Sequence, residues 1–336
     1  MIQGIYIIDK RGFCILARRY GLIEIDENLI GGFLTAILRF SSKIIQGLEN
    51  ADNLQEILLR DYSILYVSGN NVRVFAIVDK EDRGEQVREI LSKISDVFTK
   101  KFDSQLQNWN GNVQPFSGFE QKIDEILLES EMGESILSEL AEAMPKATVS
   151  IPDKAKTPAL SLKQILRRSK TFMFKTILAG DKEVGKTSIV QRATENQFPT
   201  EYLPTIGCDF AVKQLDIGKN KVRLHFWDFA GSADFKQMRR ELYIDADLAV
   251  LIFDLTNPES FQNLEKWRQE ILNSFGPLNL IVVVGNKIDL ERKIPVEECL
   301  KYSQEINAPY FETSAKLGIN IEEAFKSVAE LLLEKE

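Results

Sequence analysis

The residues best suited to chemistry form a glycine-rich segment at 180–187. Its sequence, Gly-Asp-Lys-Glu-Val-Gly-Lys-Thr, fits the pattern G-x-x-x-x-G-K-[ST]. Gly180 and Gly185 let the backbone approach anionic groups closely and adopt positive φ angles. Backbone N–H groups and the amino end of the following helix add partial positive charge. We therefore expect Lys186 to contact the β- and γ-phosphates of a nucleotide and the Thr187 hydroxyl to bind Mg²⁺. The other residues of the predicted phosphate site are Asp181, Lys182, Glu183, Val184 and Ser188.

Strands and helices must hold this loop in place, and the second half of the chain predicts both. An apolar, strand-like run at 172–179 directly precedes the loop, and a helical stretch follows it. Alternation of strands and helices predicts a mainly parallel sheet covered by helices. The turn Gly218-Lys219-Asn220 predicts one antiparallel hairpin between the second and third strands. The further strand candidates are 210–217, 222–227, 248–253, 280–284 and 310–311.

Segment 171–336 resembles a small GTPase of the Ras superfamily, nearest to the Ras and Rab pattern. Besides the phosphate loop, four motifs appear in the family order: Y-L-P-T-I-G at 202–207, D-F-A-G at 228–231, N-K-I-D at 286–289 and T-S-A-K at 313–316. The resemblance implies an α/β fold with a mainly parallel six-stranded sheet. It also implies GTP and GDP as ligands, Mg²⁺ as cofactor, and a GTP-hydrolysing molecular switch that meets protein effectors and regulators.

The same resemblance assigns roles around the γ-phosphate. Asp228 would hold Mg²⁺ through water, and Thr205 would bind Mg²⁺ directly and pair with the γ-phosphate. The Gly231 amide would sense that phosphate, and Phe198 would pack its aromatic ring against the base. The residues that this resemblance places in catalysis are Lys186, Thr205, Gly231 and Ser232.

The last two motifs also have a physical reason to select guanine. The Asp289 carboxylate can accept two N–H groups from the Watson–Crick edge of guanine, whereas adenine presents an acceptor there and would leave the charge poorly paired. Asn286 would tie the base-reading loop to the phosphate loop. The aliphatic stem of Lys287 would cover the base, and the Ala315 amide would donate to the guanine oxygen. Ser314 and Lys316 complete the predicted base site.

Three residues depart from the family pattern. Ser232 follows Gly231 where most Ras and Rab members place the glutamine that orients the attacking water, and serine is too short to replace it. We therefore expect slow intrinsic hydrolysis, with a non-hydrolysing GTP-binding scaffold as the alternative. Lys182 and Glu183 stand where Ras has two glycines. Lys182 either offers a charge near the γ-phosphate or points to solvent, and we favour solvent.

The first half of the chain reads as a separate α+β segment. Strand-like runs at 2–8 and 13–20 precede a helical stretch that contains Leu29 and Leu38, and further strands, a long amphipathic helix and a shorter helix follow. The order ββαβββαα resembles a longin domain, a profilin-like sheet flanked by helices that occurs in trafficking proteins. A roadblock domain usually opens with a helix, and some other small α+β domain is the remaining alternative. The later elements are expected at 54–59, 64–67, 72–78, 87–102 and 119–128.

These patterns divide the chain into a longin-like binding module at 1–130, a linker at 131–170 and a GTPase domain at 171–336. The linker is rich in Pro, Lys, Ser and Thr. Near its end, Lys163 and Arg167 lie in a basic and apolar stretch. That stretch is either a short amphipathic helix on anionic lipid or, as we favour, a solvated helix.

Composition narrows the other function classes. A net charge of −8 on 336 residues disfavours a nucleic-acid partner, because such binding relies on neutralising phosphates. Three distant cysteines and the single His225, which we expect to be structural, give no basis for a disulfide framework or a His-dependent metal site. The N-K-I-D motif disfavours an ATP-dependent kinase or motor.

The ends of the chain bear on location. The sequence has neither an apolar run of about 20 residues nor a recognisable signal peptide or lipidation motif. We expect a cytoplasmic protein, with protein or peripheral membrane contact through the longin-like module left open.

Overall fold

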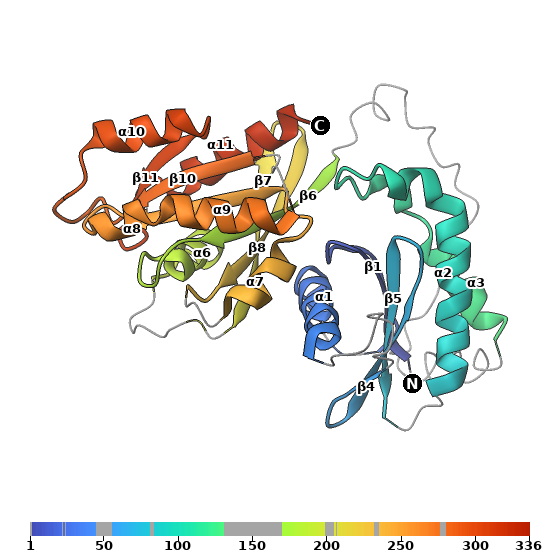
Figure 1. Cartoon of the computed structure of the whole chain (residues 1–336). Helices are drawn as coiled ribbons and strands as arrows, with labels where there is room; N and C mark the ends of the chain where they lie inside the picture. Colours follow the sequence, from blue (N-terminus) through green and yellow to red (C-terminus); the bar gives the residue numbers. More distant parts are fainter. Residues whose placement is uncertain are drawn as a thin grey trace. The chain divides into compact units, whose positions relative to one another are not determined.

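The computed structural model describes residues 2–21, 23, 25–44, 56–80, 84–130, 170–198, 205, 207–231, 235–275 and 280–336. The chain divides into two compact units, one of residues 1–34 and 41–170 and the other of 35–40 and 171–336 (Figure 1). Most of the expected linker, including Lys163 and Arg167, lies outside the described residues, as does Ser232.

The first unit contains a five-stranded antiparallel sheet in the order β2-β1-β5-β4-β3. The predicted element order ββαβββαα is confirmed, with a short 3₁₀ turn between the last two helices that the sequence did not reveal. The elements are β1 (Ile2–Asp9), β2 (Cys14–Arg19), α1 (Glu27–Ile44), β3 (Glu56–Leu58), β4 (Tyr62–Ser68), β5 (Val72–Asp79), α2 (Gly84–Gln107), η2 (Gln114–Phe116) and α3 (Glu120–Leu128).

The β1–β2 turn has an identifiable cause. The Asp9 carboxylate accepts hydrogen bonds from the backbone N–H groups of Arg11 at 3.0 Å and Phe13 at 2.8 Å. Gly12 takes a φ of 98°, which favours glycine. A short acidic residue and a glycine therefore close the hairpin that the sequence predicts here.

An aromatic cluster fills the space between α2 and the segment after it. The rings of Phe98 and Phe119 meet edge to face at 4.9 Å, and those of Phe102 and Phe116 do so at 5.2 Å. All four side chains are buried. Edge-to-face packing favours such clusters beyond the area that they bury. It explains why η2, which supplies Phe116, is ordered although it has no helical periodicity.

The second unit contains a six-stranded sheet in the order β11-β10-β9-β6-β8-β7. Only the β7–β8 pair is antiparallel, as the Gly218 turn predicts. The elements are β6 (Thr171–Ala179), α6 (Lys186–Glu195), β7 (Cys208–Ile217), β8 (Asn220–Phe229), α7 (Lys236–Tyr243), β9 (Leu248–Asp254), α8 (Pro258–Gln262), α9 (Leu264–Phe275), β10 (Leu280–Asn286), α10 (Val296–Glu305), β11 (Tyr310–Thr313) and α11 (Ile321–Glu334).

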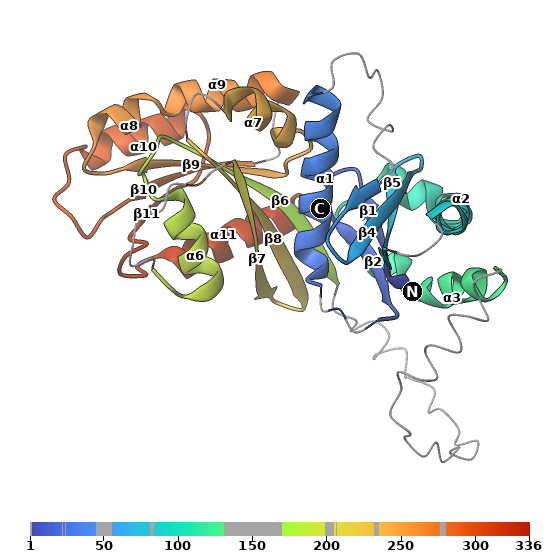
Figure 2. The same ribbon diagram turned by 90° about the horizontal axis from the view of Figure 1, so that it is seen from below.

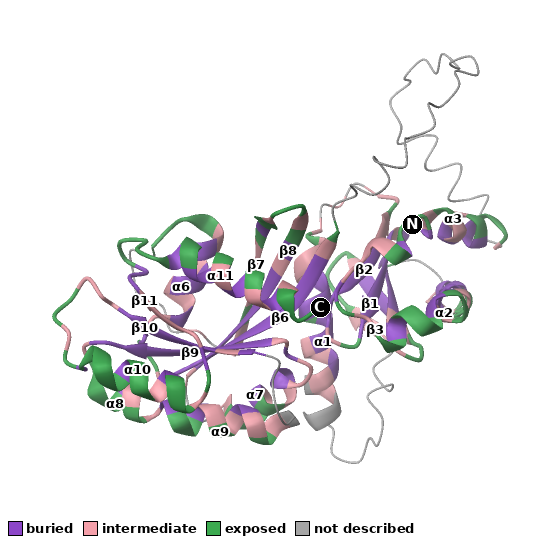
Figure 3. Ribbon diagram, turned by 90° about the horizontal axis from the view of Figure 1, so that it is seen from above, coloured by how far each residue is buried: buried purple, intermediate pink, exposed green. Residues whose placement is uncertain are grey.

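Helices cover both faces of this sheet, with α7 and α9 on one side and α6 and α11 on the other (Figure 2). The central strand β9 is buried at every residue (Figure 3). Strands buried on both faces read as continuous apolar runs, which explains why the sequence located them well. In such sheets, ligands bind at the carboxyl ends of the strands. The loops after β6, β8 and β10 carry the predicted motifs to that edge.

None of the helices in the described part of the chain is long and apolar enough to cross a membrane.

Candidate nucleotide-binding site

The loop between β6 and α6 needs glycine at its two ends. Gly180 has a φ of 153°, and a Cβ there would lie 2.1 Å from the backbone oxygen of Ile252. Gly185 has a φ of 96°, and its Cβ would lie 2.3 Å from Nδ2 of Asn286. Each glycine thus allows the loop to pack against a neighbouring strand end. The course of the loop is therefore constrained by the ends of β9 and β10.

Two positions of the loop carry residues other than the glycines that Ras has there, and both are exposed. Lys182 and Glu183 are exposed, and Glu183 has a φ of 64°. A non-glycine residue in the left-handed region costs roughly 1 kcal/mol. The exposed position of Lys182 agrees with the solvent-facing alternative. Asp181 and Ser188 are half-buried, and Val184 is buried.

Lys186 is a buried cation held by the loop that it serves. Its Nζ donates to the carbonyl oxygens of Gly180 at 2.9 Å and Asp181 at 2.8 Å. Burial lowers the pKa of Lys186 to about 8, while the nearby Asp228 carboxylate acts to raise it. An anion brought to this loop would favour the charged form. The arrangement therefore suits phosphate binding.

Three oxygen-bearing side chains meet beside the amino end of α6. The hydroxyl oxygens of Thr187 and Thr205 lie 2.8 Å apart, and the Thr187 hydroxyl also donates to Oδ2 of Asp228. Oδ1 of Asp228 is buried and has no hydrogen-bond partner among the described residues. Burial raises the pKa of Asp228 to about 6. One carboxylate and two hydroxyls are ligands of the kind that Mg²⁺ takes, so these residues fit the metal that the sequence predicts.

The D-F-A-G segment packs directly on the phosphate loop. A Cβ on Gly231 would lie 2.9 Å from Nζ of Lys186 and 3.0 Å from the oxygen of Gly180. Only glycine lets the backbone come this close to the buried cation. The Gly231 amide is thus carried to the same place as Lys186. The next residue, Ser232, lies outside the described residues.

Asn286 joins three loops. Its Nδ2 donates to the carbonyl oxygen of Val184 at 2.9 Å, and its Oδ1 accepts from the amide of Ala315 and the hydroxyl of Thr313, each at 3.2 Å. The side chain is buried, so all of these bonds are shielded from water. The phosphate loop and the T-S-A-K segment are therefore fixed to each other through one amide.

Asp289 faces the T-S-A-K segment. Its Oδ1 accepts from the Ser314 hydroxyl at 2.6 Å, and that hydroxyl in turn accepts from the amide of Leu317 at 3.0 Å. Lys287 lies beside them with its Nζ 2.6 Å from Oδ2 of Asp254. Fixing one carboxylate oxygen by a hydroxyl orients the Asp289 side chain while leaving it half-buried and reachable.

Sequence reasoning missed one residue of the site. Arg192 on α6 donates to the carbonyl oxygens of Ala315 at 2.9 Å and Lys316 at 2.8 Å. It belongs to no motif, and its helix position gave no sign of this role. Phe198 exposes 40% of its surface, and Lys316 is also exposed.

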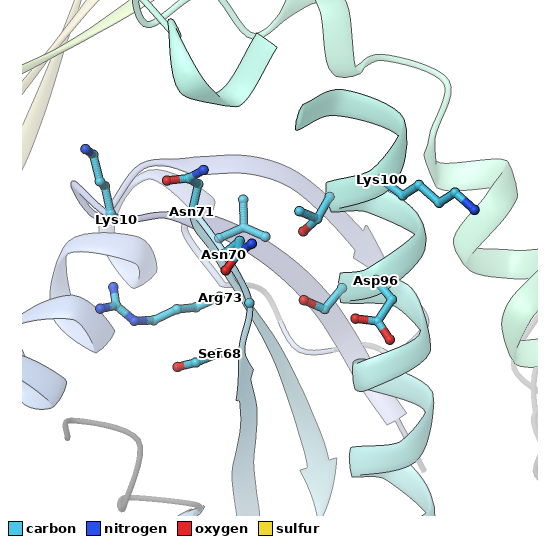
Figure 4. A pocket seen from close by; sticks show the side chains of 11 residues that line it. Lys10, Ser68, Asn70, Asn71, Arg73, Asp96 and Lys100 are labelled. Carbon is cyan, nitrogen blue, oxygen red and sulfur yellow. The ribbon is translucent and has the colours of Figure 1, made fainter. Parts of the chain in front are cut away.

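The first unit has a separate pocket of about 800 Å³ between the β4–β5 turn and α2. Asn70 and Asn71 line it on the turn (Figure 4). The side chains of Lys10, Arg73 and Lys100 point in different directions in this view and do not converge on one ligand position.

Comparison with known proteins agrees with the geometry. The model of the Ras family matches residues 175–334. Ras-related protein Rab7 of Drosophila melanogaster is 39% identical over 173 residues, which is 50% of this chain and 84% of that protein. The chain belongs to the Ras family. Ypt/Rab-type GTPase ypt7 of Schizosaccharomyces pombe is also 39% identical, over 49% of this chain and 84% of its own length. Ras-related protein Rab-21 of Bos taurus is 36% identical, over 49% and 75%.

This Ras-family chain is thus a GTP-binding small GTPase. The family match begins four residues after the start of β6 and ends with α11, so it lies within the second unit.

We predict that Gly180→Ala damages the site far more than Gly218→Ala. Both glycines have positive φ, but a Cβ on Gly218 meets nothing within 4 Å. Gly218→Ala should cost about 1 kcal/mol of unfolding free energy and leave nucleotide affinity unchanged. Gly180→Ala must also displace the backbone of β9, so it should cost at least about 2 kcal/mol more and weaken GDP binding about tenfold or more.

Urea unfolding and titration with a fluorescent GDP analogue measure the two effects. Equal losses in both variants would contradict a close-packed phosphate loop.

Proposed function

We propose that the protein is a GTP-dependent switch that binds GTP with Mg²⁺, hydrolyses it slowly, and couples its nucleotide state to partner binding in trafficking-like regulation. The observation that carries this proposal is the Asn286 side chain, which joins Val184 of the phosphate loop to Ala315 of the base-reading segment. That bond set brings a phosphate site and a guanine-selective carboxylate within reach of one nucleotide.

Asp289 would select guanine over adenine. With Ser314 holding one oxygen of the carboxylate, the side chain is oriented to accept the two N–H groups of the guanine edge. The Ala315 amide, which donates to Oδ1 of Asn286 at 3.2 Å, would share its N–H with the guanine oxygen. The aliphatic stem of Lys287 and the ring of Phe198 would cover the base. The Lys287–Asp254 ion pair supports this by fixing the end of the lysine side chain.

The buried groups of the site would bind the phosphates. Lys186 and the loop amides neutralise the phosphate oxygens. Thr187 and Thr205 would hold Mg²⁺ directly, and Asp228 would hold it through water. When bound, Mg²⁺ would supply positive charge that stabilises the negative charge of the phosphate oxygens during transfer of the γ-phosphoryl group to water. The amide of Gly231, which lies close to Lys186, would donate to the γ-phosphate.

The switch follows from these contacts. Thr205 and Gly231 would both contact the γ-phosphate, so loss of that group would remove both contacts. Partners that read the segments around these two residues, namely effectors and regulators, would then distinguish the GTP state from the GDP state. We place the protein in the cytoplasm. The first unit would bring it to a protein or to the surface of a membrane.

A non-hydrolysing GTP-binding scaffold is the second candidate, and Ser232 is the feature that favours it. In that case the nucleotide would be a structural part, and turnover would be absent even with cell extract present.

We predict that Asp289→Asn exchanges guanine for xanthine preference. An amide cannot accept both N–H groups of guanine, so GTP affinity should fall by at least about 2 kcal/mol, roughly thirtyfold. Competition binding with GTP and xanthosine triphosphate measures the change. Asp216→Asn, which alters an exposed aspartate on β7, is the matched control and should leave both affinities unchanged. A variant that still prefers GTP would show that the base site is assigned to the wrong carboxylate.

We predict that Ser232→Gln speeds intrinsic hydrolysis, because glutamine can orient the attacking water where serine cannot reach. The wild type should turn over at or below the roughly 10⁻⁴ s⁻¹ of unassisted Ras. Single-turnover hydrolysis of bound GTP gives the rate, and GTP affinity in the same variant is the control.

A fast wild type that Ser232→Gln slows would instead point to another group. Lys182→Ala would then test whether this exposed lysine positions the water. No turnover in either form, with or without extract, favours the scaffold.

A further inference from the structure

The phosphate loop is anchored to α9 through the side chain of Asp181. Oδ1 of Asp181 accepts from the indole N–H of Trp267 at 2.7 Å, and Oδ2 accepts from Nδ2 of Asn263 at 2.8 Å. Asn263 immediately precedes α9, and Trp267 lies in its first turns. Both oxygens of the loop carboxylate are therefore held by one end of one helix.

The face of the same indole supports a second loop. The guanidinium of Arg239 on α7 lies 4.7 Å from the centre of the Trp267 ring, which is a cation–π contact. Arg239 donates to the backbone oxygen of Ala230 at 2.9 Å and forms a two-pronged ion pair with Glu270 of α9 at 2.9 and 3.3 Å. Ala230 directly precedes Gly231, so this arginine holds the end of the D-F-A-G segment.

Burial restricts the movement of the side chains that make these contacts. Trp267 and Arg239 are both buried, with 9% and 2% of their surfaces exposed. A buried guanidinium N–H that loses its acceptor is left unsatisfied at a cost in free energy, so movement of Ala230 requires Arg239 to move with it. Arg239 in turn rests on the ring that holds Asp181. The edge of the Trp267 indole binds Asp181 of the phosphate loop, and its face contacts Arg239, which binds the D-F-A-G segment. One side chain thus connects the two loops that meet at Lys186.

We propose that Trp267 is a positioning residue that couples the phosphate loop to the D-F-A-G segment and thereby raises the preference for GTP over GDP. This inference rests on the proposed GTP switch. The γ-phosphate contacts both loops, and it does so best when their spacing is fixed in advance. GDP lacks that phosphate and gains less from the fixed spacing. Loss of the Asp181–Trp267 bond should therefore cost GTP more than GDP.

The test is a double-mutant cycle on the ratio of GDP to GTP dissociation constants, measured with Mg²⁺. Trp267→Phe keeps an aromatic ring under Arg239 but removes the N–H that Asp181 accepts. Asp181→Ala removes the acceptor. Each variant should lower the preference for GTP by about fivefold or more. Because both break the same bond, the double variant should be no worse than Asp181→Ala alone.

Trp109→Phe is the matched control. It makes the same substitution in the first unit and also removes an indole donor, which bonds to the oxygen of Asn112 at 2.7 Å. Its GTP preference should equal that of the wild type. A purely structural role for Trp267 would lower the melting temperature and weaken both nucleotides by one factor, and this outcome overturns the proposal. Strictly additive effects of Trp267→Phe and Asp181→Ala on the GTP preference would also overturn the proposal.

The wild-type measurement separates this proposal from the proposed function. If the wild type binds neither GTP nor GDP, the GTP switch itself fails. If it binds both normally and the ratio is unchanged in the variants, only the coupling role of Trp267 fails.

Discussion

The nucleotide site of the second unit depends on the buried ammonium group of Lys186, which is hydrogen-bonded to no carboxylate among the residues that the structure describes. Nζ of Lys186 is hydrogen-bonded to two carbonyl oxygens and lies against the backbone of Gly231, where burial lowers its pKa. Such a group is costly to keep charged unless anions come to it. The glycine ends of the loop, the close approach of the D-F-A-G segment and the anchoring of Asp181 all serve to hold this cation where phosphates can reach it.

The sequence located the parts of this site well because motif residues and buried parallel strands both leave strong local patterns. Gly180, Gly185 and Asn286 are required by close contacts that any chain following this path would meet. Arg192 and Trp267 could not be predicted in the same way. Their contacts join residues that are 123 and 86 positions apart, and nothing in the local sequence around them marks these pairings. In the first unit, η2 was missed because its order comes from the packing of Phe116 and not from helical periodicity.

The two units differ in what their residues reveal. In the second unit, chemical motifs select the function and the fold only positions them. In the first unit, the order of elements is clear. The charged side chains that line its pocket beside Asn70, however, point in different directions (Figure 4). Its resemblance to a longin domain therefore rests on topology alone, and topology by itself does not specify a ligand.

The dependence of GTP affinity on Mg²⁺ tests the central claim most directly, because it requires Lys186, Thr187, Thr205 and Asp228 to act on one ligand. GTP, GDP and ATP affinities of the full chain would be measured with Mg²⁺ and again with an excess of chelator. We predict tight binding of GTP and GDP, no comparable binding of ATP, and a loss on chelation that is larger for GTP than for GDP. Equal GTP affinity with and without chelator, or equal binding of ATP and GTP, would contradict the account.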